Sequence, residues 1–216
     1  MRGVYFGDYH TATDWGLILS AKDIQPPTPK IISVNIDGRD GVLDLSRALT
    51  GELKYNNRSA SFTFLITEGT PSDREELLQE IINTIHGKIL QIIEPDFPEY
   101  YLLGECSIKS VNNNKSYGSF TVSANCEPYK YYVDEVNRVI SASSSSTDVI
   151  LSNRGRKTLT PTITVDGSVN LVTNSTSVAL STGTYKLTTL TLPPGSTIVS
   201  VSGSGIVTFS YREAIL

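Results

Sequence analysis

The sequence predicts a mostly β protein of the α+β class, in which a sheet with one helix is followed by a smaller all-β part. Three observations support this. Several segments in the first two thirds of the chain alternate apolar and polar residues, which is typical of strands. One segment there has the spacing of an amphipathic helix. The last third has no helical period and carries turn residues at intervals.

The clearest strands lie over residues 32–36, 60–66 and 120–126, where every second residue is apolar. Because successive side chains of a strand point to opposite faces, each of these segments is expected to have one buried face and one face in water.

The helix is predicted from Ser72 to His86. Ser72 is expected to be the N-cap, with Glu75 completing a capping box, and Gly87 is expected to end the helix. An apolar stripe at spacings of three and four is formed by Leu77, Leu78, Ile81, Ile82 and Ile85. This stripe predicts that the helix packs on a sheet.

A change in composition places a domain boundary near residue 140. Residues 1–140 hold 13 Lys and Arg against 19 Asp and Glu, whereas residues 141–216 hold 5 against 3 and are rich in Ser and Thr. The polar segment Ser141–Thr147 is expected to be the linker. Strands are predicted in the second domain at residues 162–165, 177–180, 185–187, 197–201 and 206–211, with turns at 166–167, 182–183, 193–195 and 203–205. The pattern favours a small β-sandwich or jelly roll.

The charge and composition exclude several classes of protein. A net charge of −4 argues against a protein that binds nucleic acid by neutralising phosphates. No apolar run approaches the roughly 18 residues that cross a membrane, and the first residues lack the apolar segment of a signal peptide. We therefore expect no membrane insertion and assembly in the cytoplasm. The spacing of Cys106 and Cys126 does not favour a disulfide.

The sequence offers no catalytic constellation. His10 and His86 lie at no metal-ligand spacing, so they are expected to have solvated or helix-capping roles. Asp37, Asp40 and Asp44 come closest to a cluster; turn and surface roles are favoured for them over a calcium site. We expect no enzyme activity, no metal and no cofactor.

Four segments together resemble the distal tail protein (Dit) family of long, non-contractile tailed bacteriophages and their prophages. They are FGDYHTATDWGL (Phe6–Leu17), VNIDGRDGVLDLS (Val34–Ser46), YNNRSASFTF (Tyr55–Phe64) and VSVSGSGIVTFSYREAIL (Val199–Leu216). Their order along the chain is that of the family, and they span nearly the whole sequence.

The resemblance implies a structural protein of the virion that forms a hexameric ring at the tail tip, or baseplate. One face of such a ring meets the tail tube protein and the other meets the tail-associated hub protein. The resemblance also implies a split-barrel-like β-sandwich with one helix in residues 1–140, which builds the ring. Residues 141–216 would form an outward, galectin-like or jelly-roll-like domain that could meet receptor-binding proteins or a host surface glycan.

In a ring protein, the polar segment from Asn35 to Arg58 is expected to contact a neighbouring subunit. Asp37, Arg39, Asp40 and Arg58 are the predicted contact residues, because alternating charges can set register between copies. The competing interpretation is a solvated hairpin that turns at Asp37-Gly38.

Two other functions have less support in the sequence. A carbohydrate-binding accessory adhesin would use the second domain, but that domain has no Trp, and Phe209 and Tyr211 fall on the core face of a strand with Val207. A hydrolase has no catalytic residues to support it.

Overall fold

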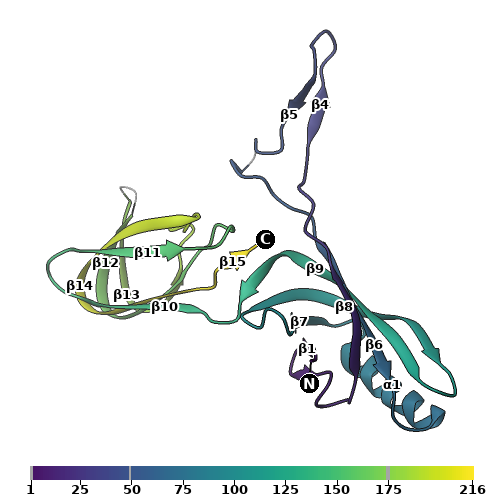
Figure 1. The fold of residues 1–216 in the computed structure, drawn as a ribbon. Coiled ribbons are helices and arrows are strands. Elements are labelled where there is room, and N and C mark those ends of the chain that lie inside the picture. Colours follow the sequence, from purple (N-terminus) through teal and green to yellow (C-terminus); the bar gives the residue numbers. More distant parts are fainter. Residues whose placement is uncertain (1, 49, 174–175) are drawn as a thin grey trace. The chain divides into compact units, whose positions relative to one another are not determined.

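The computed structural model describes residues 2–48, 50–173 and 176–216, which form two compact units. The first unit comprises the residues up to Lys130 together with Leu216, and the second comprises Tyr131–Ile215. Strands dominate both units, and α1 (Pro71–Ile85) is the one α-helix of the described residues (Figure 1). The predicted fold class is therefore confirmed. None of the helical structure described is long and apolar enough to cross a membrane.

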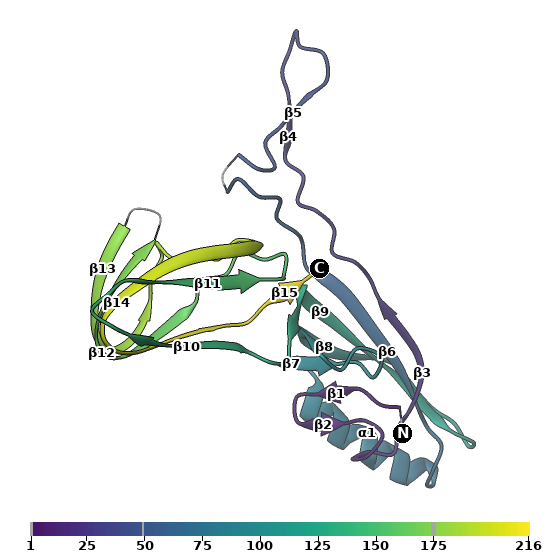
Figure 2. The same ribbon diagram turned by 60° about the vertical axis from the view of Figure 1, so that its left-hand side comes forward.

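The first unit is built on a curled antiparallel sheet with the strand order β2-β1-β7-β8-β9-β6-β3. Its strands are β1 (Tyr5–Phe6), β2 (Tyr9–His10), β3 (Ile18–Ile24), β6 (Arg58–Ile66), β7 (Ile89–Ile93), β8 (Tyr100–Asn113) and β9 (Gly118–Tyr132). Two further strands, β4 (Ser33–Asn35) and β5 (Val42–Asp44), pair only with each other. Figure 2 shows this pair at the end of a long excursion from the sheet.

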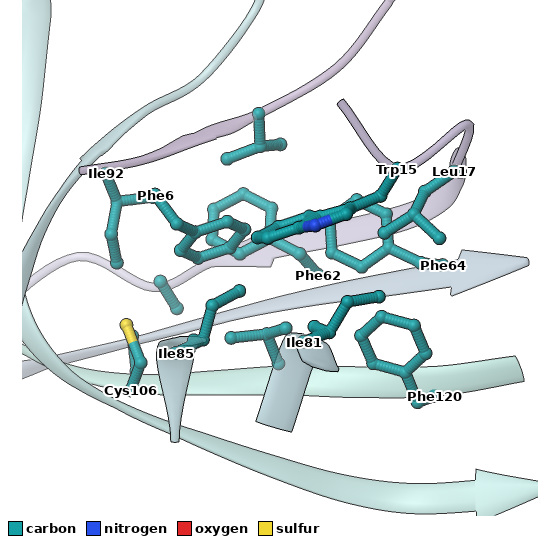
Figure 3. Close-up of a cluster of buried hydrophobic side chains, with 14 of the residues drawn as sticks. Phe6, Trp15, Leu17, Phe62, Phe64, Ile81, Ile85, Ile92, Cys106 and Phe120 are labelled. Carbon is teal, nitrogen blue, oxygen red and sulfur yellow. The ribbon is translucent and has the colours of Figure 1, made fainter. Parts of the chain in front are cut away.

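The core of the first unit lies between the sheet and the helix. Phe62 and Phe64 of β6 and Phe120 of β9 are fully buried, and Ile81 and Ile85 of α1 reach the same cluster (Figure 3). Burying each such side chain contributes about 1.5–3 kcal/mol. The apolar stripe of the helix therefore packs on the sheet, as the sequence predicts.

The start of the helix differs from the prediction. Thr70, not Ser72, is the N-cap: its hydroxyl accepts a hydrogen bond from the Asp73 N–H, and the Asp73 carboxylate accepts one from the Thr70 N–H. The reason is Pro71, whose fixed φ and missing N–H suit the first helical position and so place the cap at Thr70, two residues before the predicted one. The helix ends before Gly87, which has a φ of +73°, as predicted.

Both cysteines are free thiols buried in the first unit. Gly104 lies directly beside Cys126, since a Cβ added there would be 2.6 Å from the Cys126 Sγ. Burial raises the pKa of Cys106 to about 12 and that of Cys126 to about 11. Both therefore stay protonated at neutral pH and serve as small core residues.

The second unit is a β-structure organised around one long strand, β14 (Gly195–Tyr211). This strand pairs with β11 (Thr147–Asn153) along its first part and with β10 (Val136–Ala142) along its last part. It also pairs with β12 (Thr162–Thr173) from Ser200 to Ser210, alongside most of the part that pairs with β10. β12 also pairs with β13 (Thr176–Lys186), and the short β15 (Ala214–Ile215) follows β14. Val207, Phe209 and Tyr211 share the buried face of β14, as predicted.

Three of the predicted turns in the second unit lie inside strands. Gly167 is within β12, Gly183 within β13, and Gly203 and Gly205 within β14. These glycines have φ values from +122° to +158°, and a Cβ added at Gly205 would lie 2.0 Å from the Asp166 carbonyl oxygen. Gly167, Gly203 and Gly205 therefore let two paired backbones approach closely, whereas a Cβ at Gly183 would meet only the Tyr185 side chain.

The segment predicted as a linker joins two strands of the second unit. Residues 141–147 run from the end of β10 to the start of β11, and both strands pair with β14. The boundary between the two units falls at Lys130, before β10. The division of roles between residues 1–140 and 141–216 stays a prediction.

Candidate functional site

The most distinctive feature of the first unit is the excursion between β3 and β6, which we call the arm and define as residues 28–56. Its two sides are bonded at the base: the Asn56 N–H donates to the Thr28 carbonyl at 2.8 Å, and the Lys30 N–H donates to the Lys54 carbonyl at 2.8 Å. Beyond the base, β4 and β5 form a two-stranded ribbon. Both Figure 1 and Figure 2 show the arm standing away from the sheet of the first unit.

The ribbon of the arm has one apolar face. Val34 lies opposite Leu43, and the Leu45 N–H donates to the Ile32 carbonyl at 2.8 Å. Because side chains alternate along a strand, Ile32, Val34 and Ile36 of one side share a face with Leu43 and Leu45 of the other. The opposite face carries Ser33, Asn35, Val42, Asp44 and Ser46.

The apolar face of the arm is not covered by the described part of this chain. The exposed fractions are 51% for Ile32, 42% for Val34 and 44% for Ile36. The sequence predicts a strand with one buried face here, and within the single chain that prediction is wrong. The physical reason is that the ribbon has only two strands and leaves the sheet. An isolated two-stranded hairpin is marginally stable in water, and exposed apolar faces of this kind are typical of interaction sites.

The tip of the arm carries three charged side chains. Asp37, Arg39 and Asp40 are all exposed, and in the described part of the chain none of them forms an ion pair. Gly38 and Gly41 have φ values of +82° and +74°, which glycine adopts without strain. The tip is therefore a well-defined turn that presents charge to the outside.

Asp44, the third carboxylate of the predicted acidic cluster, is hydrogen-bonded to Ser46 close by in the sequence. The Asp44 carboxylate accepts a hydrogen bond from the Ser46 N–H at 2.8 Å, and its hydrogen bonds to Ser46 lower the pKa of Asp44. No group of three metal-ligating side chains occurs among the residues that the structure describes.

Arg58 lies apart from the other three predicted contact residues. It is the first residue of β6, opposite Cys126, and only 4% exposed. It lines a groove of about 370 Å³ with Ile24, Pro26, Pro27, Lys130 and Leu216. The structure thus brings Asp37, Arg39 and Asp40 together at the arm tip and places Arg58 in a separate recess. Sequence reasoning missed the recess, since its walls come from distant segments.

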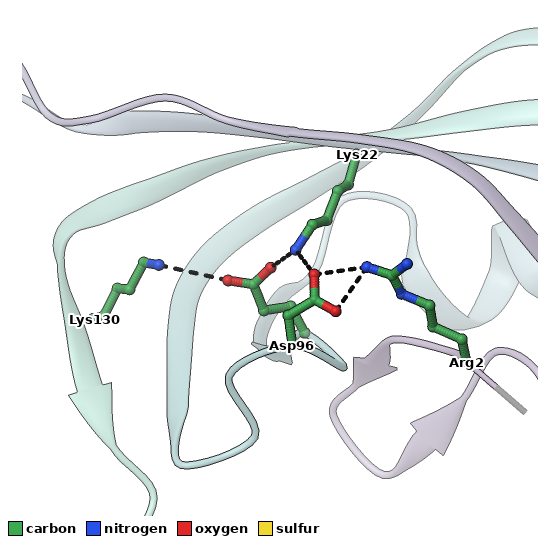
Figure 4. A network of polar contacts seen from close by, with 5 residues as sticks. Arg2, Lys22, Asp96 and Lys130 are labelled. Carbon is green, nitrogen blue, oxygen red and sulfur yellow. Dashed lines mark hydrogen bonds and ion pairs between the residues drawn. The ribbon is translucent and has the colours of Figure 1, made fainter.

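An ion-pair network holds the sheet beside this recess (Figure 4). The Lys22 ammonium contacts both Glu94 and Asp96, Arg2 pairs with Asp96 at 2.6 Å, and Lys130 pairs with Glu94 at 3.5 Å. The hydrogen bond from Lys22 lowers the pKa of Asp96. The charges of the network face one another, so it stabilises the arrangement of β3, β9 and the segment after β7.

The two histidines have structural partners. His10 Nδ1 lies 2.9 Å from the Thr13 hydroxyl, and His86 Nδ1 accepts a hydrogen bond from the Ile108 N–H at 3.0 Å. The second bond ties the end of α1 to β8. The Thr13 hydroxyl in turn donates to Asp14 at 3.1 Å, and the His10 backbone N–H donates to the same carboxylate, so His10 belongs to a local hydrogen-bonded turn. The arm remains the strongest candidate for function.

A comparison with solved structures finds the same fold in another protein. No protein-family model matches the sequence, and no curated protein matches it either. Among solved structures, the crystal structure of the Dit protein of phage SPP1 matches with a TM-score of 0.71 and 16% sequence identity. The match covers 98% of this chain and 99% of that one. The SPP1 protein is described as a paradigm of the hub adsorption apparatus in phages that infect Gram-positive bacteria. This likeness shows that the present chain has the Dit fold.

Proposed function

We propose that this chain is a structural component of a phage tail, because it has the fold of a tail hub protein over almost its whole length. In this proposal, copies of the chain form a ring at the distal end of the tail, or baseplate. The ring joins the tail tube protein on one side to the tail-associated hub protein on the other. The role is structural and requires no chemical activity.

The uncovered apolar face of the arm is the observation that most supports association of the copies into a ring. Ile32, Val34 and Ile36 are about half exposed, so burying the rest of each would contribute roughly 0.6–1.5 kcal/mol. A surface of this kind is typical of a site for another protein. In this proposal the arm of one copy packs on a different surface of the next copy. Such head-to-tail contacts between identical chains close into rings or grow into filaments.

The ring proposal assigns different tasks to the two units. The first unit, which carries the arm, builds the ring, and six copies are the expected number by analogy with the family. The second unit is left to meet receptor-binding proteins or a surface glycan. The finished assembly belongs to the virion tail tip and is put together in the bacterial host.

A role as a sugar-binding adhesin has weaker support. A groove of about 540 Å³ in the second unit is lined in part by Tyr131, Lys157 and Tyr211. However, Tyr211 is buried and its hydroxyl donates to the Ser152 carbonyl, while the Lys157 ammonium lies 4.9 Å from the centre of the Tyr131 ring. Sugar sites usually stack a ring on an open aromatic face, and this groove offers little of one.

The mass of the purified chain in solution tests the ring. At concentrations up to several hundred micromolar, light scattering is expected to detect a discrete oligomer of the 23.5 kDa chain, and electron microscopy is expected to show closed rings. Open filaments would support the head-to-tail contact but would contradict a closed ring. A monomer over the whole concentration range would reject the ring.

A further inference from the structure

Arg58 is a buried cation that has no counter-charge among the described residues. It is 4% exposed, and in this part of the chain its Nε has no hydrogen-bond partner. Burial lowers the pKa of its guanidinium, and no carboxylate among the described residues offsets this effect. A buried charge without a partner costs free energy, so it is uncommon unless another molecule supplies an opposite charge or a hydrogen-bond acceptor.

A second buried arginine of the first unit has a fully hydrogen-bonded guanidinium. Arg74 is 3% exposed, and its guanidinium donates to the Asn113 side chain, the Gly69 carbonyl and the Asn114 carbonyl at 2.6–3.2 Å. Every nitrogen of Arg74 therefore has an acceptor. The same chain thus satisfies one buried guanidinium fully and leaves the other without an acceptor at Nε.

The groove at Arg58 has the chemistry of a carboxylate site. Its walls are apolar, formed by Ile24, Pro26, Pro27 and Leu216. The other cation, Lys130, is already engaged by Glu94 and lies over the Phe97 ring. A carboxylate that entered this groove would find a planar guanidinium able to donate two parallel hydrogen bonds, in surroundings where such bonds are strong.

We propose that the groove receives a carboxylate from the arm tip of a second copy of this chain, either Asp37 or Asp40. The two acidic side chains are exposed at the tip and form no ion pair with described residues of their own chain. Ile36, which directly precedes Asp37, is also exposed and matches the apolar walls of the groove. The contact is head to tail, so this inference rests on the proposed ring and names the point where each arm ends.

A double-mutant cycle tests the contact. One variant carries Arg58→Met, a second carries Asp37→Asn together with Asp40→Asn, and a third combines all three changes. We expect each of the first two to weaken association of the copies at least about tenfold. The third is expected to be no weaker than Arg58→Met alone, because the pair is already broken. Arg39→Gln is the control at the same tip, and its effect is expected to add independently to that of Arg58→Met.

The melting temperature of each unassociated variant completes the test. Arg58→Met is expected to melt at or above the wild-type temperature, since it removes an uncompensated buried charge. A lower melting temperature with unchanged association would mean that Arg58 serves the fold, and would overturn the inference. Additive effects in the cycle would also overturn it while leaving the ring intact. A wild-type chain that never associates would overturn both.

Discussion

Replacing Val34 by lysine will prevent assembly without unfolding the chain. Val34 lies at the centre of the apolar face of the arm, opposite Leu43, and is 42% exposed. Because less than half of Val34 is left to bury in a contact between copies, losing that burial weakens the contact roughly three- to tenfold, and a lysine there adds the larger cost of desolvating a charge. In a ring every copy donates one such contact and receives another, so the loss repeats around the assembly.

The fold itself is expected to tolerate Val34→Lys. Exposed substitutions away from special backbone positions usually change stability by less than about 0.5 kcal/mol. Circular dichroism and thermal melting should therefore match the wild type, while sedimentation velocity shows only monomer.

Val42 supplies a matched control for this experiment. It is the same residue type on the partner strand of the same ribbon and is 57% exposed, but it pairs with Asn35 and so lies on the opposite, polar face. Val42→Lys is expected to leave assembly unchanged. Equal loss from both variants would mean that the whole arm is merely sensitive to charge, and normal assembly of Val34→Lys would show that the apolar face is not an interface.

Replacing Gly205 by alanine will unfold the second unit. The added Cβ would lie 2.0 Å from the Asp166 carbonyl oxygen and 2.9 Å from the Gly167 Cα, and the backbone there has a φ of +132°. Neither neighbour is a flexible side chain, so two paired strands have to separate. Strain and overpacking together cost roughly 2–6 kcal/mol, which is a large part of the stability of a small domain.

Gly195→Ala is the matched control, since Gly195 begins the same strand with a φ of +109° but has no atom within 4 Å of the added Cβ. It is expected to cost only the backbone term, roughly 1–3 kcal/mol. The difference between the two variants then measures the close approach of the strands.

The sole tryptophan allows the two units to be followed separately. Trp15 is buried in the first unit, where its indole N–H donates to Glu80 at 3.2 Å. In Gly205→Ala, tryptophan fluorescence should keep its unfolding transition while far-ultraviolet circular dichroism loses strand signal at low temperature. Equal, small effects of the two glycine substitutions would contradict the close packing of β12 and β14.

Local patterns predicted the helix and the main strands because their information lies in neighbouring residues. The stripe from Leu77 to Ile85 requires a helix whatever packs on it, and only the cap was misplaced, since Pro71 outweighed Ser72. The turns predicted at the glycines 167, 203 and 205 were wrong for a different reason. Glycine marks both turns and close strand crossings, and only the partner strand decides which one occurs.

The candidate site was predicted in part. The arm-tip residues Asp37, Arg39 and Asp40 are grouped in the sequence and stay grouped in space. Arg58 is the first residue of a strand, and nothing local indicates that it would be buried without a counter-charge among the described residues. The apolar face of the arm has the alternation of an ordinary strand, so the sequence alone could not show that the chain leaves it uncovered.

Site-specific photo-cross-linking tests most directly whether the arm of one copy lies on another. A benzophenone amino acid would replace Ile36, at the tip end of the apolar face, and an identical probe at Val42 would serve as the control. The account predicts that the Ile36 probe links separate copies into a ladder at multiples of 23.5 kDa, and that the Val42 probe links few. Cross-links confined to single chains, at concentrations where the wild type assembles, would contradict it.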